Sequence, residues 1–159
     1  MNNLQARLSE VIATLLYVGY VPYAPGTIAS FVTVVAAYVF SFSRLNQPLV
    51  MLFLSVLFAI GCLSSHFFIR LSPSINSDDD PGIIVIDEVF GMMIALVCVP
   101  GDVMWYGMAF ILFRIFDIAK PYPISFCERN IRGFLGIMLD DLLAGLGARF
   151  VLWAMMTLY

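Results

Sequence analysis

Charged residues are rare in this chain: they make up 12% of its 159 residues, whereas hydrophobic residues make up 62%. Lys120 is the only lysine, and the formal net charge at pH 7 is −3. Proteins that bind nucleic acids need a basic surface, and attraction to anionic lipid headgroups needs clusters of basic residues. The composition therefore excludes a nucleic-acid partner and a polybasic patch for lipid headgroups. Nothing in it indicates an obligate protein partner.

Histidine and cysteine are also scarce. His66 is the only histidine, so the chain lacks the pair that a histidine-nucleophile lipid phosphatase uses. The three cysteines are odd in number and widely spaced, which indicates neither a disulfide framework nor a metal site. Cys127 precedes Arg132 with four residues between them, not the five of the cysteine phosphatases, and no Asp-x-Asp motif lies in an early strand context. These absences argue against a covalent phosphoenzyme.

Long uncharged runs are what the chain does have. Residues 11–43 carry no charge, residues 45–69 carry none apart from His66, and the mean hydropathy is +0.96. Because a hydrocarbon core about 30 Å thick needs roughly 20 apolar residues in a helix, residues 49–69 predict a membrane span. The segment 28–43 is shorter but extends upstream without charge. A very apolar soluble helical bundle is the alternative.

The hydrophobic pattern predicts helices throughout. No run alternates with a period of two over a useful length, so we expect an all-α fold: a compact, multi-helix, membrane-embedded bundle forming a single domain over residues 1–159. We expect a polar loop at the water interface over residues 72–81, which includes Asp80. Prolines and glycines separate helices that we expect at about 4–20, 27–42, 48–71, 84–98 and 103–119, a short helix or loop at 127–134, and a final helix through residues 140–141 to the end.

Two pairs of carboxylates interrupt this apolar sequence, Asp87-Glu88 and Asp140-Asp141. Acids in the first turn of a helix stabilise its dipole by about 0.3–1 kcal/mol, which explains one carboxylate but not four in two similar settings. Poorly solvated acids that repel each other need compensation, and a bound divalent cation supplies it. Hard oxygen ligands favour Mg²⁺ or Mn²⁺. Without a covalent nucleophile, the chemistry left is attack by water activated by metal-bound carboxylates.

A third acid, Asp117, lies between two cations at steps of three residues, Arg114 and Lys120. That spacing keeps the three on adjoining parts of one helix face. The face is either a self-satisfied salt-bridge ladder or a phosphate clamp around a metal-binding carboxylate. In addition, Pro25, Gly26 and Thr27 begin a predicted helix, where free backbone N–H groups and a hydroxyl form a weak signal for an anion site.

Four segments together resemble the phosphatidylglycerophosphatase A family: PGTIAS at 25–30, IVIDEVFG at 84–91, FRIFDIAKPYPI at 113–124 and GIMLDDLLAG at 136–145. The resemblance implies a Mg²⁺-dependent, multi-pass enzyme of the bacterial inner membrane that hydrolyses phosphatidylglycerophosphate to phosphatidylglycerol and phosphate, with its active site facing the cytoplasm. It carries the metal and catalytic roles to Asp87, Glu88, Asp117, Asp140 and Asp141, and phosphate binding to Arg114, Lys120, Gly26 and Thr27.

Two other functions compete with this one. A CDP-alcohol phosphotransferase needs further aspartates beyond an Ala-Arg pair, but no acid follows Asp141. A membrane carrier for a divalent cation or an anion would use the same acidic cluster. Arg114 and Lys120 beside the acids argue against a pure cation pathway.

Overall fold

The computed structural model describes residues 3–71, 82–131 and 133–158, and these are helical with no strand among them. The all-α prediction is therefore confirmed, while the expected polar loop with Asp80 lies outside the described residues. The elements are α1 (Asn3–Ala13), η1 (Val18–Tyr20), α2 (Pro25–Val39), η2 (Phe42–Arg44), α3 (Gln47–Leu71), α4 (Ile86–Ala95), α5 (Val103–Ala119), α6 (Ile124–Asn130) and α7 (Phe134–Leu158).

The first helix ends at Ala13, seven residues before the predicted end at Tyr20. The carbonyl of Ala13 accepts a hydrogen bond from the Val85 N–H, and the Tyr17 N–H donates to the Thr14 hydroxyl instead of continuing the helix. The end of α1 is thus determined by a contact with the segment that leads into α4. Local sequence could not reveal this contact.

The start of α2 also differs from the prediction. The helix was expected to begin near residue 27, but its N-cap is Ala24 and Pro25 occupies the first turn. Proline suits that position because its fixed φ matches the helix and its missing N–H would be unpaired there anyway. By contrast, α5 begins as predicted, because the Asp102 side chain accepts a hydrogen bond from the Met104 N–H at 2.7 Å.

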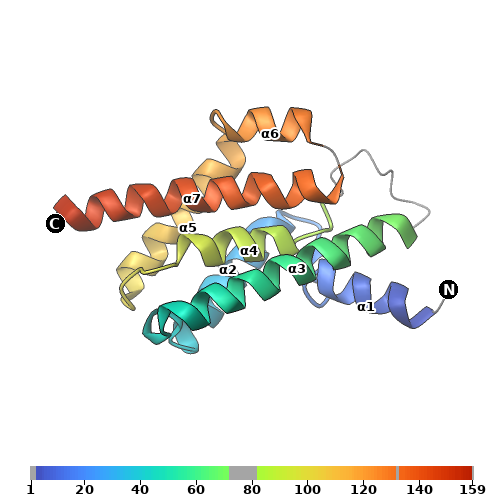
Figure 1. Cartoon of the computed structure of the whole chain (residues 1–159), viewed down its shortest axis with the longest axis horizontal. Coiled ribbons are helices and arrows are strands. Elements are labelled where there is room, and N and C mark those ends of the chain that lie inside the picture. Colours follow the sequence, from blue (N-terminus) through green and yellow to red (C-terminus); the bar gives the residue numbers. More distant parts are fainter. Residues whose placement is uncertain (1–2, 72–81, 132, 159) are drawn as a thin grey trace.

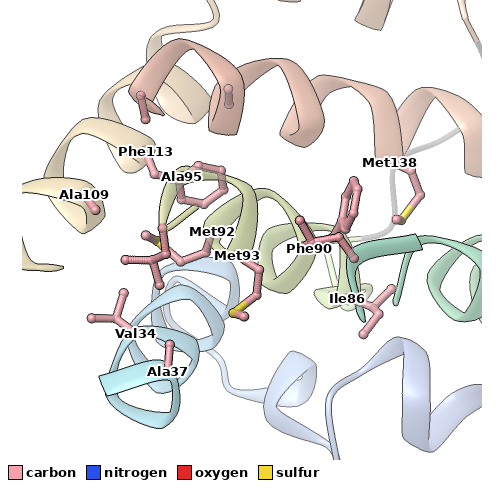
Figure 2. Packing of buried hydrophobic residues seen from close by; sticks show 14 of the residues in the cluster. Val34, Ala37, Ile86, Phe90, Met92, Met93, Ala95, Ala109, Phe113 and Met138 are labelled. Atoms are coloured by element: carbon pink, nitrogen blue, oxygen red, sulfur yellow. The ribbon is translucent and has the colours of Figure 1, made fainter. Parts of the chain in front are cut away.

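Helix α4 is the centre of the fold. It packs against α2, α3, α5 and α7, and the long helices α3 and α7 flank it in Figure 1. The buried side chains of α4 meet those of α2, α5 and α7 in one core, as Figure 2 shows for Phe90, Met92, Met93, Phe113 and Met138. The first turn of α4 carries Asp87 and Glu88, so both acids lie on the central helix of the bundle.

Glycines bring α4 and α7 into backbone contact. A Cβ on Gly91 would lie 2.5 Å from the carbonyl oxygen of Asp141, and a Cβ on Gly145 would overlap the carbonyl of Gly91. Real Cβ atoms do not approach so closely, so the crossing depends on both glycines. Asp87 precedes Gly91 by four residues, and Asp141 precedes Gly145 by four. Because residues four apart share a helix face, this contact directs both acids toward the same junction.

Apolar side chains form exposed stripes on the outer faces of several helices. On α3, Leu52, Val56 and Ile60 follow one another at intervals of four residues. Similar stripes occur on α2 (Phe31, Val35, Val39), α5 (Ile111, Ile115, Ile118) and α7 (Leu146, Phe150, Trp153). Among the described residues, α3 is the one helix long and apolar enough to cross a membrane, and only 28% of its most apolar window is buried. Such continuous apolar surfaces are typical of proteins that contact a membrane or another apolar partner.

Candidate active site

Three carboxylates from two helices meet inside the bundle. Asp87 and Glu88 come from α4 and Asp141 comes from α7, and one oxygen from each lies within 4.8 Å of the others. Asp87 and Asp141 are buried, at 6% and 4% exposure. The structure therefore brings together acids that are more than fifty residues apart, as the sequence analysis expected. We call Asp87, Glu88 and Asp141 the carboxylate trio.

Asp117 of α5 lies beside this trio. It is a hydrogen-bond neighbour of Asp141, and its charge acts on Glu88. Arg114, one turn earlier on α5, forms an ion pair with Asp117 at 2.6 Å between Nη1 and Oδ2. The first half of the predicted cation–anion–cation face therefore exists, and it borders the trio.

Lys120 pairs with an acid of a different helix. It is the C-cap of α5 with a left-handed backbone (φ 41°), and its Nζ pairs with Asp140 of α7 at 2.9 Å. Asp140 and Asp141 are adjacent on a helix and so diverge by about 100°. Asp141 joins the trio, whereas Asp140 binds Lys120. Through this second pair the charge of Lys120 also lies near the acids.

The first turn of α2 closes another side of the site. Gly26 is buried directly against Glu88, because a Cβ there would lie 2.8 Å from Glu88 Cδ and overlap Oε1. Thr27, half-buried, follows in the same turn. The predicted Pro-Gly-Thr segment is thus in contact with one of the predicted acids through its glycine. The unpaired N–H groups of a first helical turn are suited to an anion.

Ser30 was not predicted as a site residue, although it closes the segment PGTIAS. It is fully buried, and its hydroxyl donates to the Gly26 carbonyl at 2.8 Å. The same oxygen accepts from Arg114 Nη1 at 3.5 Å. Its position one turn after Gly26 could have indicated a site role, because residues four apart lie on the same side of a helix. Ser30 helps to orient the guanidinium next to Asp117.

The electrostatics of the site favour a bound cation. Burial raises the pKa of the Glu88 carboxyl above its ordinary value of 4.5; a hydrogen bond with Asp87 opposes this rise, and the nearby charge of Asp117 adds to it. Glu88 Oε2 is buried and meets no hydrogen-bond partner in the described part of the chain. An unpartnered buried carboxylate oxygen, within a group of hard oxygen donors, fits a divalent cation such as Mg²⁺.

Comparison with known proteins agrees with this arrangement. A model of the family "Phosphatidylglycerophosphatase A" matches residues 11–156, which include every residue of the site described above. The Phosphatidylglycerophosphatase A of Escherichia coli is 34% identical over 136 residues, covering 85% of this chain and 76% of that protein. The protein of the same name from Haemophilus influenzae is 34% identical over 137 residues, covering 86% and 81%.

A third relative carries a different name. The "Putative phosphatidylinositol-3-phosphatase" of Bacteroides thetaiotaomicron is 36% identical over 149 residues, covering 87% of this chain and 87% of that protein. No solved structure gave a significant match. The family match spans most of the chain, and the relatives are phosphatases by name. The chain therefore belongs to the phosphatidylglycerophosphatase A family and is a phosphoric monoester hydrolase.

Proposed function

We propose that this chain hydrolyses phosphatidylglycerophosphate to phosphatidylglycerol and inorganic phosphate, and that it requires Mg²⁺. The observation that carries the proposal is the carboxylate trio next to the ion pair of Arg114 with Asp117, in a chain of this family. Acids that hold a cation, beside a guanidinium, suit a phosphomonoester better than a neutral substrate. The three relatives named above act, by their names, on phosphorylated lipids.

In this proposal Asp87, Glu88 and Asp141 hold Mg²⁺, and Asp117 and Asp140 complete the acidic environment while orienting Arg114 and Lys120. A cation bound there supplies positive charge to the phosphoryl oxygens and makes the attacking water more acidic. Arg114 neutralises charge that develops on the equatorial phosphoryl oxygens, and Lys120 adds to the positive potential. The N–H groups at Gly26 and Thr27 bind the phosphate from the opposite side.

The proton balance follows from the same residues. Asp117 lies outside the trio but next to Asp141, so it takes the proton of the water that attacks phosphorus. The bond between phosphorus and the glycerol oxygen then breaks, and Asp117 returns its proton to the departing oxygen, which becomes the hydroxyl of phosphatidylglycerol. Ser30 keeps the Arg114 guanidinium directed at the reacting group.

The proposed location is the bacterial inner membrane, with several helices in the bilayer and the acids facing the cytoplasm, where the substrate is made. The length and apolarity of α3 and the exposed apolar stripes on α2, α5 and α7 support membrane integration. In that arrangement the substrate's acyl chains remain in an apolar environment while its headgroup reaches the acids.

The test is phosphate release from phosphatidylglycerophosphate by purified protein, with Mg²⁺ or with excess EDTA. We expect Asp141→Asn to lose at least about a hundredfold in rate, because removing one group that stabilises developing charge costs that much. The matched control is Asp102→Asn, an equally small change at the N-cap of α5. This position is at the opposite end of α5 from Asp117, and asparagine caps a helix as well as aspartate does. Normal rates for Asp141→Asn, or in EDTA, would overturn the mechanism.

Phosphatidylinositol 3-phosphate should be assayed in parallel, because a relative is named for that activity. A higher rate on that lipid would support the proposed phosphatase chemistry but would show that phosphatidylinositol 3-phosphate is the preferred substrate. The remaining alternative is a membrane carrier, which a measurement of cation flux into liposomes would detect. We expect no cation flux. Flux without phosphate release would reject the proposal.

A further inference from the structure

An apolar groove lies between α2, α3 and α4, with a volume of about 360 Å³. Its walls are aliphatic and aromatic side chains, including Val32, Ala36, Phe53 and Met93. Thr33 is the only hydroxyl-bearing residue among the lining side chains, and its hydroxyl already donates to the Ala29 carbonyl at 2.8 Å. The lining therefore offers no free polar side chain to a ligand, and it suits a purely hydrocarbon group.

The groove lies along two of the helices that build the site. On α4, Val89 lines it and directly follows Glu88 of the trio. On α2, Gly26 touches Glu88, whereas the groove is lined from Val32 to Phe40. At 1.5 Å per residue, the groove begins about 9 Å along α2 from Gly26 and extends for about 12 Å more. Two helices thus run from the carboxylates into the groove.

The rim of the groove is open and apolar. Val32, Phe40 and Phe53 line it and are exposed, at 43%, 81% and 43%. The groove also borders α3, whose outer face is apolar. A hydrocarbon chain can therefore enter sideways from a surrounding bilayer without crossing a polar surface.

The geometry points to this groove as the seat of one acyl chain of the phospholipid substrate, with the phosphate at the carboxylate trio. This inference rests on the proposed function. One leaflet of a hydrocarbon core is about 15 Å thick, which matches the extent of the groove along α2. A peptide is a poor occupant, because its backbone N–H and carbonyl groups would be buried against walls that cannot bond them. Seating one chain here would fix the distance between the lipid's glycerol and the acids.

The test fills the groove and compares two substrates. Ala36→Phe adds a ring from the groove wall, and Ala154→Phe makes the same change at a half-buried alanine of α7 that does not line the groove. Dipalmitoyl and dihexanoyl phosphatidylglycerophosphate are assayed in mixed micelles at fixed surface concentration. We expect Ala36→Phe to lower kcat/KM for the dipalmitoyl lipid by about tenfold or more, because a misplaced substrate reacts slowly. The dihexanoyl lipid, whose short chains do not fill the groove, should keep its rate. Ala154→Phe should change neither.

An equal loss on both lipids, or no loss on either, would overturn the groove assignment while leaving phosphate release by the unaltered protein intact. If the unaltered protein releases no phosphate from either lipid, the proposed function fails instead. A second measurement, photolabelling, uses the unaltered protein and does not depend on its enzymatic activity. Phosphatidylglycerol with a photoreactive diazirine in mid-chain, in vesicles, should label peptides of α2 and α3 at Phe40 and Phe53 more strongly than the equally apolar, exposed Phe150 of α7. Equal labelling would reject the groove as a specific seat.

Discussion

Gly26 gives the sharpest test of how the site is built. Replacing it with alanine adds one methyl group to the first turn of α2, where a Cβ would lie 2.8 Å from Glu88 Cδ and overlap Oε1. Ordinary contact begins at 3.4 Å, so the carboxylate has to withdraw by more than half an ångström. The obstructing atoms are the end of a flexible side chain, so the backbone can stay in place while Glu88 moves.

The expected loss in kcat/KM is on the order of a hundredfold, because misplacing a catalytic group by about 1 Å costs that much. At 1.36 kcal/mol per tenfold, this equals about 2.7 kcal/mol of transition-state stabilisation. The free energy of unfolding should change by less than about 1 kcal/mol, since alanine is a better helix former than glycine and offsets the small rearrangement. Phosphate release and thermal unfolding in the same detergent measure the two quantities.

The control is Gly107→Ala in the interior of α5, where an added Cβ has no atom within 4 Å. It should keep full activity and gain up to about 1 kcal/mol of stability from helix propensity. If Gly26→Ala retains the rate of Gly107→Ala, then the position of Glu88 against α2 does not matter for catalysis. The reasoning about the carboxylate trio would then be refuted at that residue.

Three further predictions concern the helix crossing, the second ion pair and pH. Gly91→Ala should lower the free energy of unfolding by about 1–3 kcal/mol, because its Cβ meets the backbone of Asp141, which cannot give way; a gain in stability like that expected of Gly107→Ala would contradict the close crossing. Lys120→Met should destabilise by about 2 kcal/mol because it leaves Asp140 buried without its cation, and adding Asp140→Asn should recover most of that; no recovery in the double variant would reject the pair. In EDTA, the contribution of Glu88 to thermal stability should be fully present below about pH 4.5 and should be lost as pH rises, because the raised pKa of Glu88 means that the folded state keeps a proton which the unfolded state has lost. Mg²⁺ should restore more stability at higher pH, since it binds the ionised form, and a metal-free protein that gains stability with pH would reverse the sign.

Much of the helical framework could be predicted from local chemistry. The start of α5 at Val103 follows from the Asp102 cap, and the length of α3 follows from a largely apolar run in which His66 is the only acidic or basic residue between positions 49 and 69. The early end of α1 could not be predicted, because it depends on a hydrogen bond from Val85, seventy-two residues later in the chain. Helix boundaries that depend on tertiary partners are not contained in local propensity.

The candidate site divides in the same way. Poorly solvated carboxylates need compensation wherever the chain folds, so a site shared by the two acid pairs could be expected from sequence. Which member of the pair 140–141 would join Asp87 and Glu88 could not be expected, because that choice depends on the rotation of α7 about its own axis. The same rotation brings Asp140 to Lys120.

By itself, the sequence determined that the fold is helical, that its acids had to be compensated and that no covalent nucleophile of the familiar phosphatase classes is present. Those conclusions depend on residue types and spacings, which every conformation of the chain shares. The tertiary structure decided which acids face one another, which cation Asp117 and Asp140 each bind, and that an apolar groove lies between α2, α3 and α4. These features depend on how helices are rotated and how closely they approach, and glycines such as Gly26 and Gly91 permit that approach only in the packed molecule.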